Sequence, residues 1–308
     1  MAISNPVGGQ GIVDRFEQLV TDVANTGIVY GINNKPFTEM PNANYSLEST
    51  ILGQQNLTTA GSITTTVPTG ANAMHIIAAV GGGGGGMIGA EYDKAGGESA
   101  GGAGGSGAYI SDKVFSVTAG ETLTLVVGSG GGKGTGNGYS GSAGDGGTTS
   151  ASGSSSGSLF TLTGGTGGGV TGSVNVFGPL RTNFAGTAGT ATISGTVRTS
   201  NTFVETDGTT ININTLNGGP VGTFNQHGNG ANGTNPGNCS GDDCQITGGV
   251  GGASYNGTIA GGAGGVASSS SGGDGTRGSG GGGGGAQHQT GGGDGGTGEI
   301  RYRFLAVS

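Results

Sequence analysis

Only a few groups in the chain have the residue types and spacing that ligand or enzyme chemistry requires. Gly128-Ser-Gly-Gly-Gly-Lys-Gly-Thr135 has the composition of a phosphate-binding loop. In such a loop the lysine is followed directly by the Ser or Thr whose hydroxyl holds Mg²⁺. Here Gly134 intervenes and no helix-forming run follows, so the segment does not predict nucleotide binding. Gly-x-Gly-x-x-Gly matches are uninformative in so glycine-rich a chain, because no strand–helix–strand unit surrounds them.

The histidines and carboxylates do not form a catalytic or metal-binding pattern. His75 lies in an apolar strand and is expected to be a packed core residue, whereas His227 and His288 lie in polar segments. No His-x-x-x-His or Glu-x-x-His pair occurs, so metal ligation is not predicted. The sequence therefore predicts a protein that is not an enzyme and has no cofactor. A surface glycosidase is a weaker alternative, because its two carboxylates could be far apart in the chain.

Cys239 and Cys244 are the two cysteines of the chain, separated by Ser-Gly-Asp-Asp. A disulfide between them would stiffen an exposed tip, although so short a loop gains little stability. The alternative is a pair of reduced thiols, the state expected directly after cytoplasmic synthesis. A zinc site with His227 as a third ligand is a further alternative.

Aromatic and polar side chains between the glycine runs are the remaining candidates for function. Exposed aromatic residues flanked by Asn, Gln and Ser are well suited to recognition. The alternative for the tyrosines is that they cap the glycine-rich region and contact nothing else. The candidate receptor-binding residues are Tyr92, Asp93, Lys94, Tyr139, Phe177, Phe224, His227, Tyr255 and His288.

Glycine dominates the elements that must position these side chains. The chain has 80 glycines in 308 residues and only 9% charged residues. The glycines come as doublets and long runs with seven prolines in all, which excludes collagen. Glycine can also form an extended left-handed helix of about three residues per turn, whose outward backbone groups bond to neighbouring helices. We expect several such polyglycine-II-type helices packed side by side, since a Cβ would block their close approach.

Strand-like segments alternate with the glycine runs. We expect strands at 62–67, 74–80, 108–117, 122–127, 159–162 and 298–307, with a hairpin at 114–127. In the last strand, Ile300, Tyr302 and Phe304 share one face, and Arg301 and Arg303 share the other. The fold class predicted is mainly β, a small antiparallel β-sandwich from which glycine-rich loops emerge and return.

The N-terminal segment differs from the rest of the sequence, which predicts a division into two domains. Residues 10–25 have a helical pattern in which Ile12, Phe16, Leu19 and Val23 form one apolar stripe. We interpret residues 1–60 as an anchor helix and arm, with a short strand-like run at Ile28-Val-Tyr-Gly-Ile32. The other reading of the helix is packing within its own domain. Residues 61–308 form the glycine-rich β domain, with an inserted β lobe at about 170–247.

Charge and hydropathy exclude several functional classes. The net charge is −8 and no basic cluster occurs, so nucleic-acid binding is not expected. No apolar stretch approaches the length that spans a bilayer. The N-terminal residues lack the pattern of a secretory signal peptide. An extracellular role would therefore need another route, such as release by cell lysis.

The order of motifs resembles the glycine-rich domains of bacteriophage tail proteins and tail-fibre tips. The resemblance rests on Gly81–Gly86, Gly101–Gly107, Thr118-Ala-Gly-Glu121 and Gly298-Glu-Ile-Arg-Tyr302, and covers roughly residues 60–308. It implies a virion surface protein whose loops bind a bacterial receptor. The resemblance does not extend to residues 1–60; the apolar stripe of the expected helix is the reason to expect that residues 1–45 dock on other virion proteins. Multivalent display, for which a homotrimer is the natural candidate, would add avidity. A capsid or tail decoration protein without direct receptor binding is the alternative.

Overall fold

The computed structural model describes most of the glycine-rich β domain. The described residues are 54–87, 100–135, 141–171, 182–198, 202–204, 210–212, 248–254, 259–264, 271–284 and 291–306. The predicted anchor helix, with Ile12, Phe16, Leu19 and Val23, lies outside the described residues, as do Cys239 and Cys244.

The described residues contain fourteen strands and no helix, which confirms the prediction of a mainly β fold with antiparallel sheets. All of the strand pairs are antiparallel. The strands are β1 (Gln55–Leu57), β2 (Gly61–Thr66), β3 (Ala73–Val80), β4 (Tyr109–Ser116), β5 (Thr122–Val127), β6 (Gly141–Ser142), β7 (Thr149–Gly153), β8 (Gly157–Leu162), β9 (Gly169–Thr171), β10 (Thr182–Phe184), β11 (Ala191–Ile193), β12 (Thr202–Val204), β13 (Thr210–Asn212) and β14 (Glu299–Leu305).

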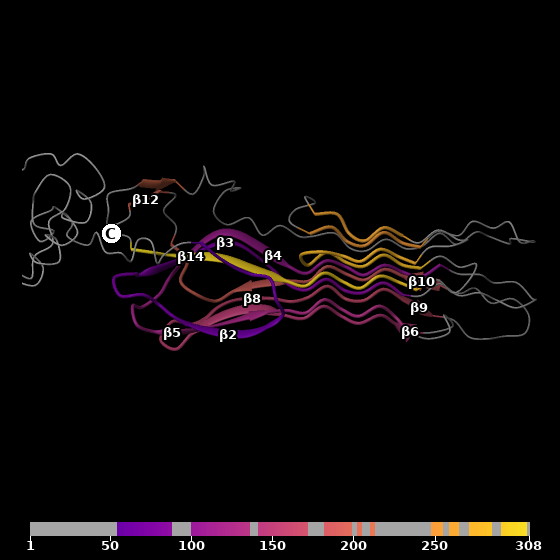
Figure 1. The fold of residues 1–308 in the computed structure, drawn as a ribbon, viewed down its shortest axis with the longest axis horizontal. Helices are drawn as coiled ribbons and strands as arrows, with labels where there is room; N and C mark the ends of the chain where they lie inside the picture. The colour runs from indigo at the N-terminus through magenta and orange to yellow at the C-terminus, as the bar shows by residue number, and fades with distance from the viewer. Residues whose placement is uncertain are drawn as a thin grey trace, which may run out of the picture.

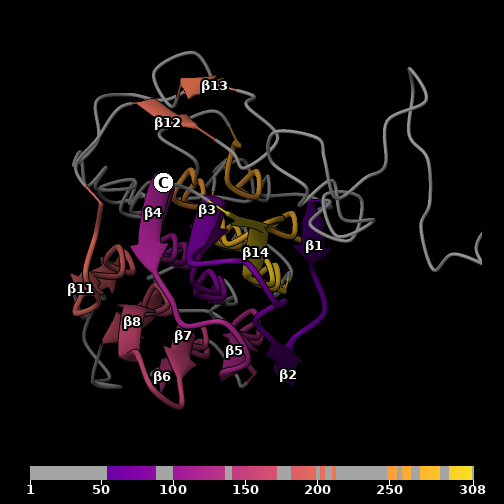
Figure 2. The same ribbon diagram turned by 90° about the vertical axis from the view of Figure 1, so that its left-hand side faces the viewer.

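Two sheets share one hydrophobic core. The four-stranded sheet has the order β1-β14-β3-β4 and the five-stranded sheet has the order β11-β8-β7-β5-β2. Figure 2 looks along the strands and shows the two sheets facing each other. Phe115 of β4 and Phe160 of β8 meet between them with ring centroids 5.9 Å apart. Strand β14, far from β3 in sequence, pairs with it and places Ile300, Tyr302 and Phe304 in the core, as their alternation predicts.

The predicted hairpin at 114–127 is wrong. Strand β4 pairs with β3, whereas β5 pairs with β2 and β7 in the opposite sheet. The turn at Thr118–Glu121 therefore joins two sheets rather than two paired strands. The Glu121 carboxylate fixes this corner, because it accepts hydrogen bonds from the backbone N–H groups of Thr118, Ser155 and Ser156 and from the Ser156 hydroxyl.

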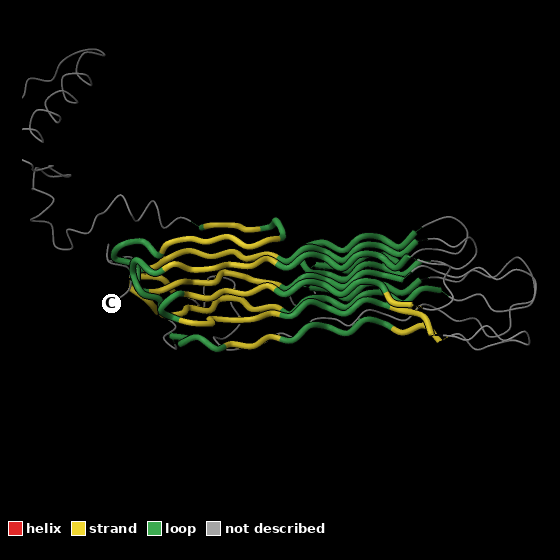
Figure 3. The backbone as a smooth tube through the Cα atoms, turned by 90° about the horizontal axis from the view of Figure 1, so that it is seen from below, coloured by secondary structure: helices red, strands yellow, loops and turns green. Residues whose placement is uncertain are grey.

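Glycine-rich segments continue from the ends of the strands and form a long bundle that extends beyond one end of the two sheets. We call this unit the glycine bundle; its described segments are 81–87, 100–108, 128–135, 143–148, 163–168, 185–190, 248–254, 259–264, 271–284 and 291–298. Figures 1 and 3 show the strands of the four- and five-stranded sheets gathered at one end and the bundle segments running side by side away from them. Segment 81–87 extends β3, and segment 291–298 leads into β14.

Hydrogen bonds between the bundle segments repeat every three residues. Segment 81–87 donates to three neighbours (100–108, 143–148 and 291–298) and accepts from three others (128–135, 163–168 and 278–284). The bonds to segment 100–108 run from Gly81 N to Ala108 O at 2.8 Å, Gly84 N to Gly105 O at 2.8 Å and Met87 N to Gly102 O at 2.9 Å. A partner that returns every third residue is expected of an extended helix with three residues per turn.

The central positions of the bundle require glycine because backbone lies against backbone. A Cβ built on Gly84 would overlap the carbonyl group of Thr166, and one built on Gly104 would overlap the carbonyl group of Gly84. Neither contact can be relieved by turning a flexible side chain. The glycine content of the chain is therefore a packing requirement of this lattice.

Short polar side chains occupy the outer positions of the bundle and satisfy N–H groups there. The Asp294 carboxylate accepts from Lys133 N at 2.7 Å, and the Asp274 carboxylate accepts from Asp294 N at 2.9 Å. The Thr166 hydroxyl accepts from Thr187 N at 2.7 Å. These side chains replace the carbonyl that a further segment would supply, so backbone donors remain satisfied where the lattice ends.

Candidate binding surface at the end of the glycine bundle

The end of the glycine bundle farther from the two core sheets, which we call the free end, brings together chain segments that are far apart in sequence. Near this end, Gly86 forms hydrogen bonds with Gly134 and Gly293. The next residue, Met87, forms them with Gly102 and Gly284, so these residues lie at the same distance along the bundle. The connections 88–99, 136–140 and 285–290 begin or end within a few residues of this level. This end is therefore where the chain can present several connecting segments on one surface.

A small sheet forms part of this end. Its order is β10-β9-β6, and one row across it consists of Phe184, Gly169 and Ser142. The Phe184 ring lies over Gly169, since a Cβ on Gly169 would overlap that ring. Phe184 is nonetheless 38% exposed, one of three large apolar residues exposed among the described residues. The absence of a side chain at Gly169 leaves the space that the end of the Phe184 ring occupies.

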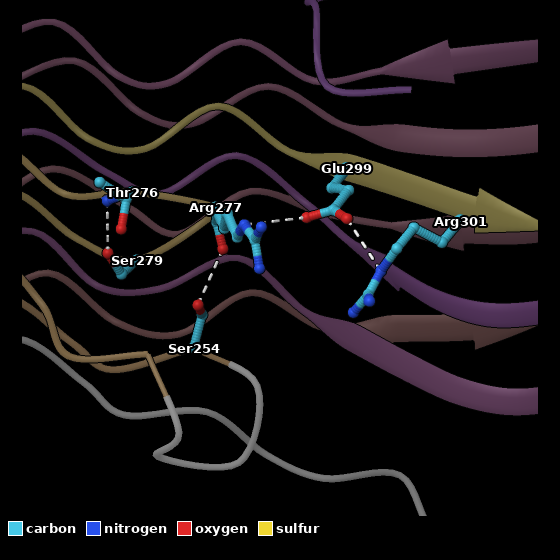
Figure 4. A network of polar contacts seen from close by, with 6 residues as sticks. All are labelled: Ser254, Thr276, Arg277, Ser279, Glu299 and Arg301. Atoms are coloured by element: carbon cyan, nitrogen blue, oxygen red, sulfur yellow. Dashed lines mark hydrogen bonds and ion pairs between the residues drawn. The ribbon is translucent and has the colours of Figure 1, made fainter. Parts of the chain in front are cut away.

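At the opposite end, a polar network joins the bundle to the sheets (Figure 4). Glu299 begins β14 and is buried; its Oε1 lies 2.9 Å from Nε of Arg301 and its Oε2 lies 3.5 Å from Nε of Arg277. Arg277 and Gly278 have φ angles of 45° and 74°, so the chain reverses there. The Ser254 hydroxyl donates to the Arg277 carbonyl at 2.8 Å. This network fixes the turn between two bundle segments against the first residue of a core strand.

We expect Glu299→Gln to lower the free energy of unfolding by about 1–3 kcal/mol, because the buried carboxylate is lost from between two arginines. Arg277→Gln is the matched comparison. The Arg277 side chain is 54% exposed, so its loss should cost less than about 1 kcal/mol. Urea unfolding of the two variants measures both values. An Arg277→Gln effect as large as that of Glu299→Gln would contradict a junction centred on the buried carboxylate.

The comparison with protein families agrees with this architecture. A model of the glycine-rich domain family matches residues 58–305, which span both the sheets and the glycine bundle. The chain belongs to this family. No curated protein is significantly similar to this glycine-rich domain. The described part of the domain contains no helix long and apolar enough to cross a bilayer.

The nine candidate receptor-binding residues of this glycine-rich domain lie outside the described residues. For most of them, the described residues on either side in the sequence show where the connection begins and ends. Tyr92, Asp93 and Lys94 belong to the connection between Met87 and Ala100; the connections with Tyr139, Phe177 and His288 are likewise flanked by residues at the free end of the bundle. Phe224 and His227 belong to 213–247, between β13 and the bundle.

Tyr255 differs from the other candidates. Its described neighbours Ser254 and Ile259 form a two-residue bridge, with Ser254 N to Ile259 O at 2.8 Å. Ile259 packs beside Val80, the last residue of β3, where the bundle meets the sheets. The described residues on either side of Tyr255 therefore lie near the sheets, away from those that flank the connections with Tyr92 and His288.

His75 is buried, as predicted, but in polar surroundings. Its Nε2 lies 3.4 Å from Oδ1 of Asp112, and Arg303 Nε donates to its Nδ1 at 3.3 Å. Asp112 has a φ of 48°, in the left-handed region that Asp tolerates better than most residues. Burial lowers the pKa of the adjacent Lys113, and the Asp112 carboxylate opposes this shift. Among the described residues, no group of three or more His, Cys, Asp or Glu side chains is placed to hold a metal ion.

Phe184 and the Glu299 network were not predicted from the sequence. Phe184 follows a glycine-poor stretch and nothing local distinguishes it from Phe177. Glu299 lies within the recognised Gly298-Glu-Ile-Arg-Tyr302 motif, and a carboxylate at the first position of an apolar strand is the signal that could have identified it. Its partner Arg277 is visible only once the bundle is assembled.

Proposed function

We propose that this glycine-rich domain is a bacteriophage virion surface protein, a tail fibre or adhesin that binds the host cell through the connections at the free end of its bundle. In this proposal the bundle is a polyglycine-II lattice and the two sheets form a small sandwich at its base. Residues 1–45 attach the protein to other virion proteins. The protein reaches the outside by cell lysis and acts without a cofactor or catalytic step.

One observation carries the proposal: connections from four places in the sequence, 88–99, 136–140, 172–181 and 285–290, have their described flanks at one end of the glycine bundle. Gln55 pairs with Tyr302 in the sheet at the other end, so the described part of the chain begins at the end where the sheets lie. Attachment at one end and several connections at the other is the geometry that display requires. Rigid backbone beneath the connections reduces the entropy lost on binding.

Cell binding by the purified full chain tests the proposal. We expect Tyr92→Ala and His288→Ala to weaken binding to host cells, by about tenfold or more for a residue central to the contact. Tyr255→Ala is the matched control, because its described flanks lie at the sheet end. Equal binding by all three variants and the unaltered chain would count against recognition by the free end.

Gold labelling of intact particles with an antibody to residues 200–308 separates an adhesin from a decoration protein. Label at distal tail or fibre tips is expected. Label scattered over the capsid would replace the proposal with the alternative, a decoration protein that does not bind the receptor directly.

A further inference from the structure

Strand β2 has one open edge. It is the last strand of the five-stranded sheet, and its pairing with β5 runs over all six residues from Gly61 to Thr66. No described strand pairs with its other edge. An edge strand of this length offers a row of outward N–H and C=O groups to another extended chain.

The other outer strands of the two sheets are either short or covered: β1 and β11 have three residues each. The outer edge of β4 is covered by residues 196–198: Ser116 N donates to Thr196 O at 3.0 Å, and Arg198 N donates to Val114 O at 2.8 Å. Natural edges are also protected by charged residues, proline or bulges. The β2 sequence, Gly-Ser-Ile-Thr-Thr-Thr, contains no charge and no proline, and its pairing with β5 has no register shift.

Ile63 indicates that the core is incomplete at this edge. Ile63 pairs with Leu125 and Thr65 pairs with Leu123, and both leucines are fully buried in the core between the sheets. Residues paired in this way direct their side chains to the same face of a sheet, so Ile63 is on the core face. It is nevertheless 42% exposed. A further strand beside β2 would cover it.

We infer that residues 28–32 of the same chain add as a strand to the open edge of β2. In the run Ile28-Val-Tyr-Gly-Ile32, Ile28, Tyr30 and Ile32 fall on one face of a strand, which suits the core side beside Ile63. Residues 33–53 link this run to Gln54, the first described residue. These 21 residues can span up to ~70 Å, far more than a return to a neighbouring strand needs.

Addition of residues 28–32 as a strand would fix the N-terminal arm, residues 1–60, to the edge of the five-stranded sheet. Backbone hydrogen bonds to β2 would supply affinity, and the apolar face would supply register. Because residues 33–60 join the run to β2 within one chain, pairing within the chain is favoured by a high effective concentration over pairing between copies. Residues 10–25, which precede the run, would then leave the domain from the side of the sheets.

Amide hydrogen exchange on the purified full chain, read residue by residue by NMR, tests the inference. The diagnostic amides are those of β2 that do not bond to β5. We expect them to be protected in the unaltered chain and to exchange at least about tenfold faster in Tyr30→Asp, which places a charge on the core side of the added strand. Tyr45→Asp, in the same arm but outside the run, is the matched control and should keep the protection. Amides of β5 and β7 should be unchanged in every variant, which shows that the sheets remain folded.

Three results would overturn the inference. The β2 amides could exchange freely in the unaltered chain, or they could keep their protection in Tyr30→Asp. Protection that falls on dilution would instead assign the edge to a second copy. Exchange is measured in the absence of cells, so each result is independent of whether the free end binds a receptor.

Discussion

Gly84→Ala should lower the free energy of unfolding by about 3 kcal/mol or more. Gly84 lies in the central segment of the bundle, and its added Cβ would overlap the Thr166 carbonyl. Relief would require two backbones to separate. Separation would also stretch the bond from Gly84 N to Gly105 O, which is 2.8 Å long. Thermal unfolding followed by circular dichroism measures the loss.

Gly132→Ala is the matched control for this prediction. Gly132 lies in the neighbouring segment 128–135, and a Cβ there would meet no atom within 4 Å. The exchange of glycine for alanine reduces the entropy of the unfolded chain equally in both variants, so this effect cancels in the comparison. Gly132→Ala should therefore be neutral or slightly stabilising. Similar losses in both variants would show that glycine is not required by close backbone packing.

The strands could be predicted from sequence because each carries its own pattern. The apolar run at 74–80 and the alternation of Ile300, Tyr302 and Phe304 are local signals, and the structure has strands at both places. Which strands pair with each other was harder to predict from the sequence. Thr118-Ala-Gly-Glu121 reads equally well as a hairpin turn or as a corner between sheets, because both need only a reversal of the chain. The choice is made by which neighbours cover the apolar faces, and these neighbours are distant in sequence.

The glycine bundle shows a different limit. Glycine content and the absence of regular proline predict extended helices packed together, and the three-residue repeat of hydrogen-bond partners agrees with that expectation. Which segments become neighbours could not be predicted, since a run such as Gly81–Gly86 has no side chain to specify a partner or a register. The few non-glycine residues, such as Asp294 and Thr166, carry that information at the outer positions. Their role becomes visible only through the N–H groups that they satisfy.

The corner between the sheets depends on one carboxylate. Glu121 is 5% exposed and accepts four hydrogen bonds, three of them from backbone N–H groups. Glu121→Ala would leave these donors without an acceptor at the turn after β4 and at the turn between β7 and β8. Bonds to a charged acceptor contribute about 1.5–3 kcal/mol, so we expect a loss of about 3 kcal/mol for the set. Glu121→Gln should cost less, because its amide oxygen keeps part of the acceptor capacity.

The dependence on pH distinguishes a carboxylate role from a packing role. Burial raises the pKa of Glu121, but the hydrogen bonds from the Ser156 hydroxyl and from Thr118, Ser156 and Ser155 N–H outweigh it and lower the pKa below its ordinary value of 4.5. A carboxyl group with a lower pKa in the folded state stabilises the fold above its unfolded pKa, and that stability is lost as the pH falls through the folded pKa. The unaltered chain should therefore lose stability below about pH 4.5 more steeply than Glu121→Gln. Urea unfolding between pH 3 and pH 7 measures both slopes. Parallel curves would mean that the corner is held by packing, with the charge of Glu121 contributing nothing.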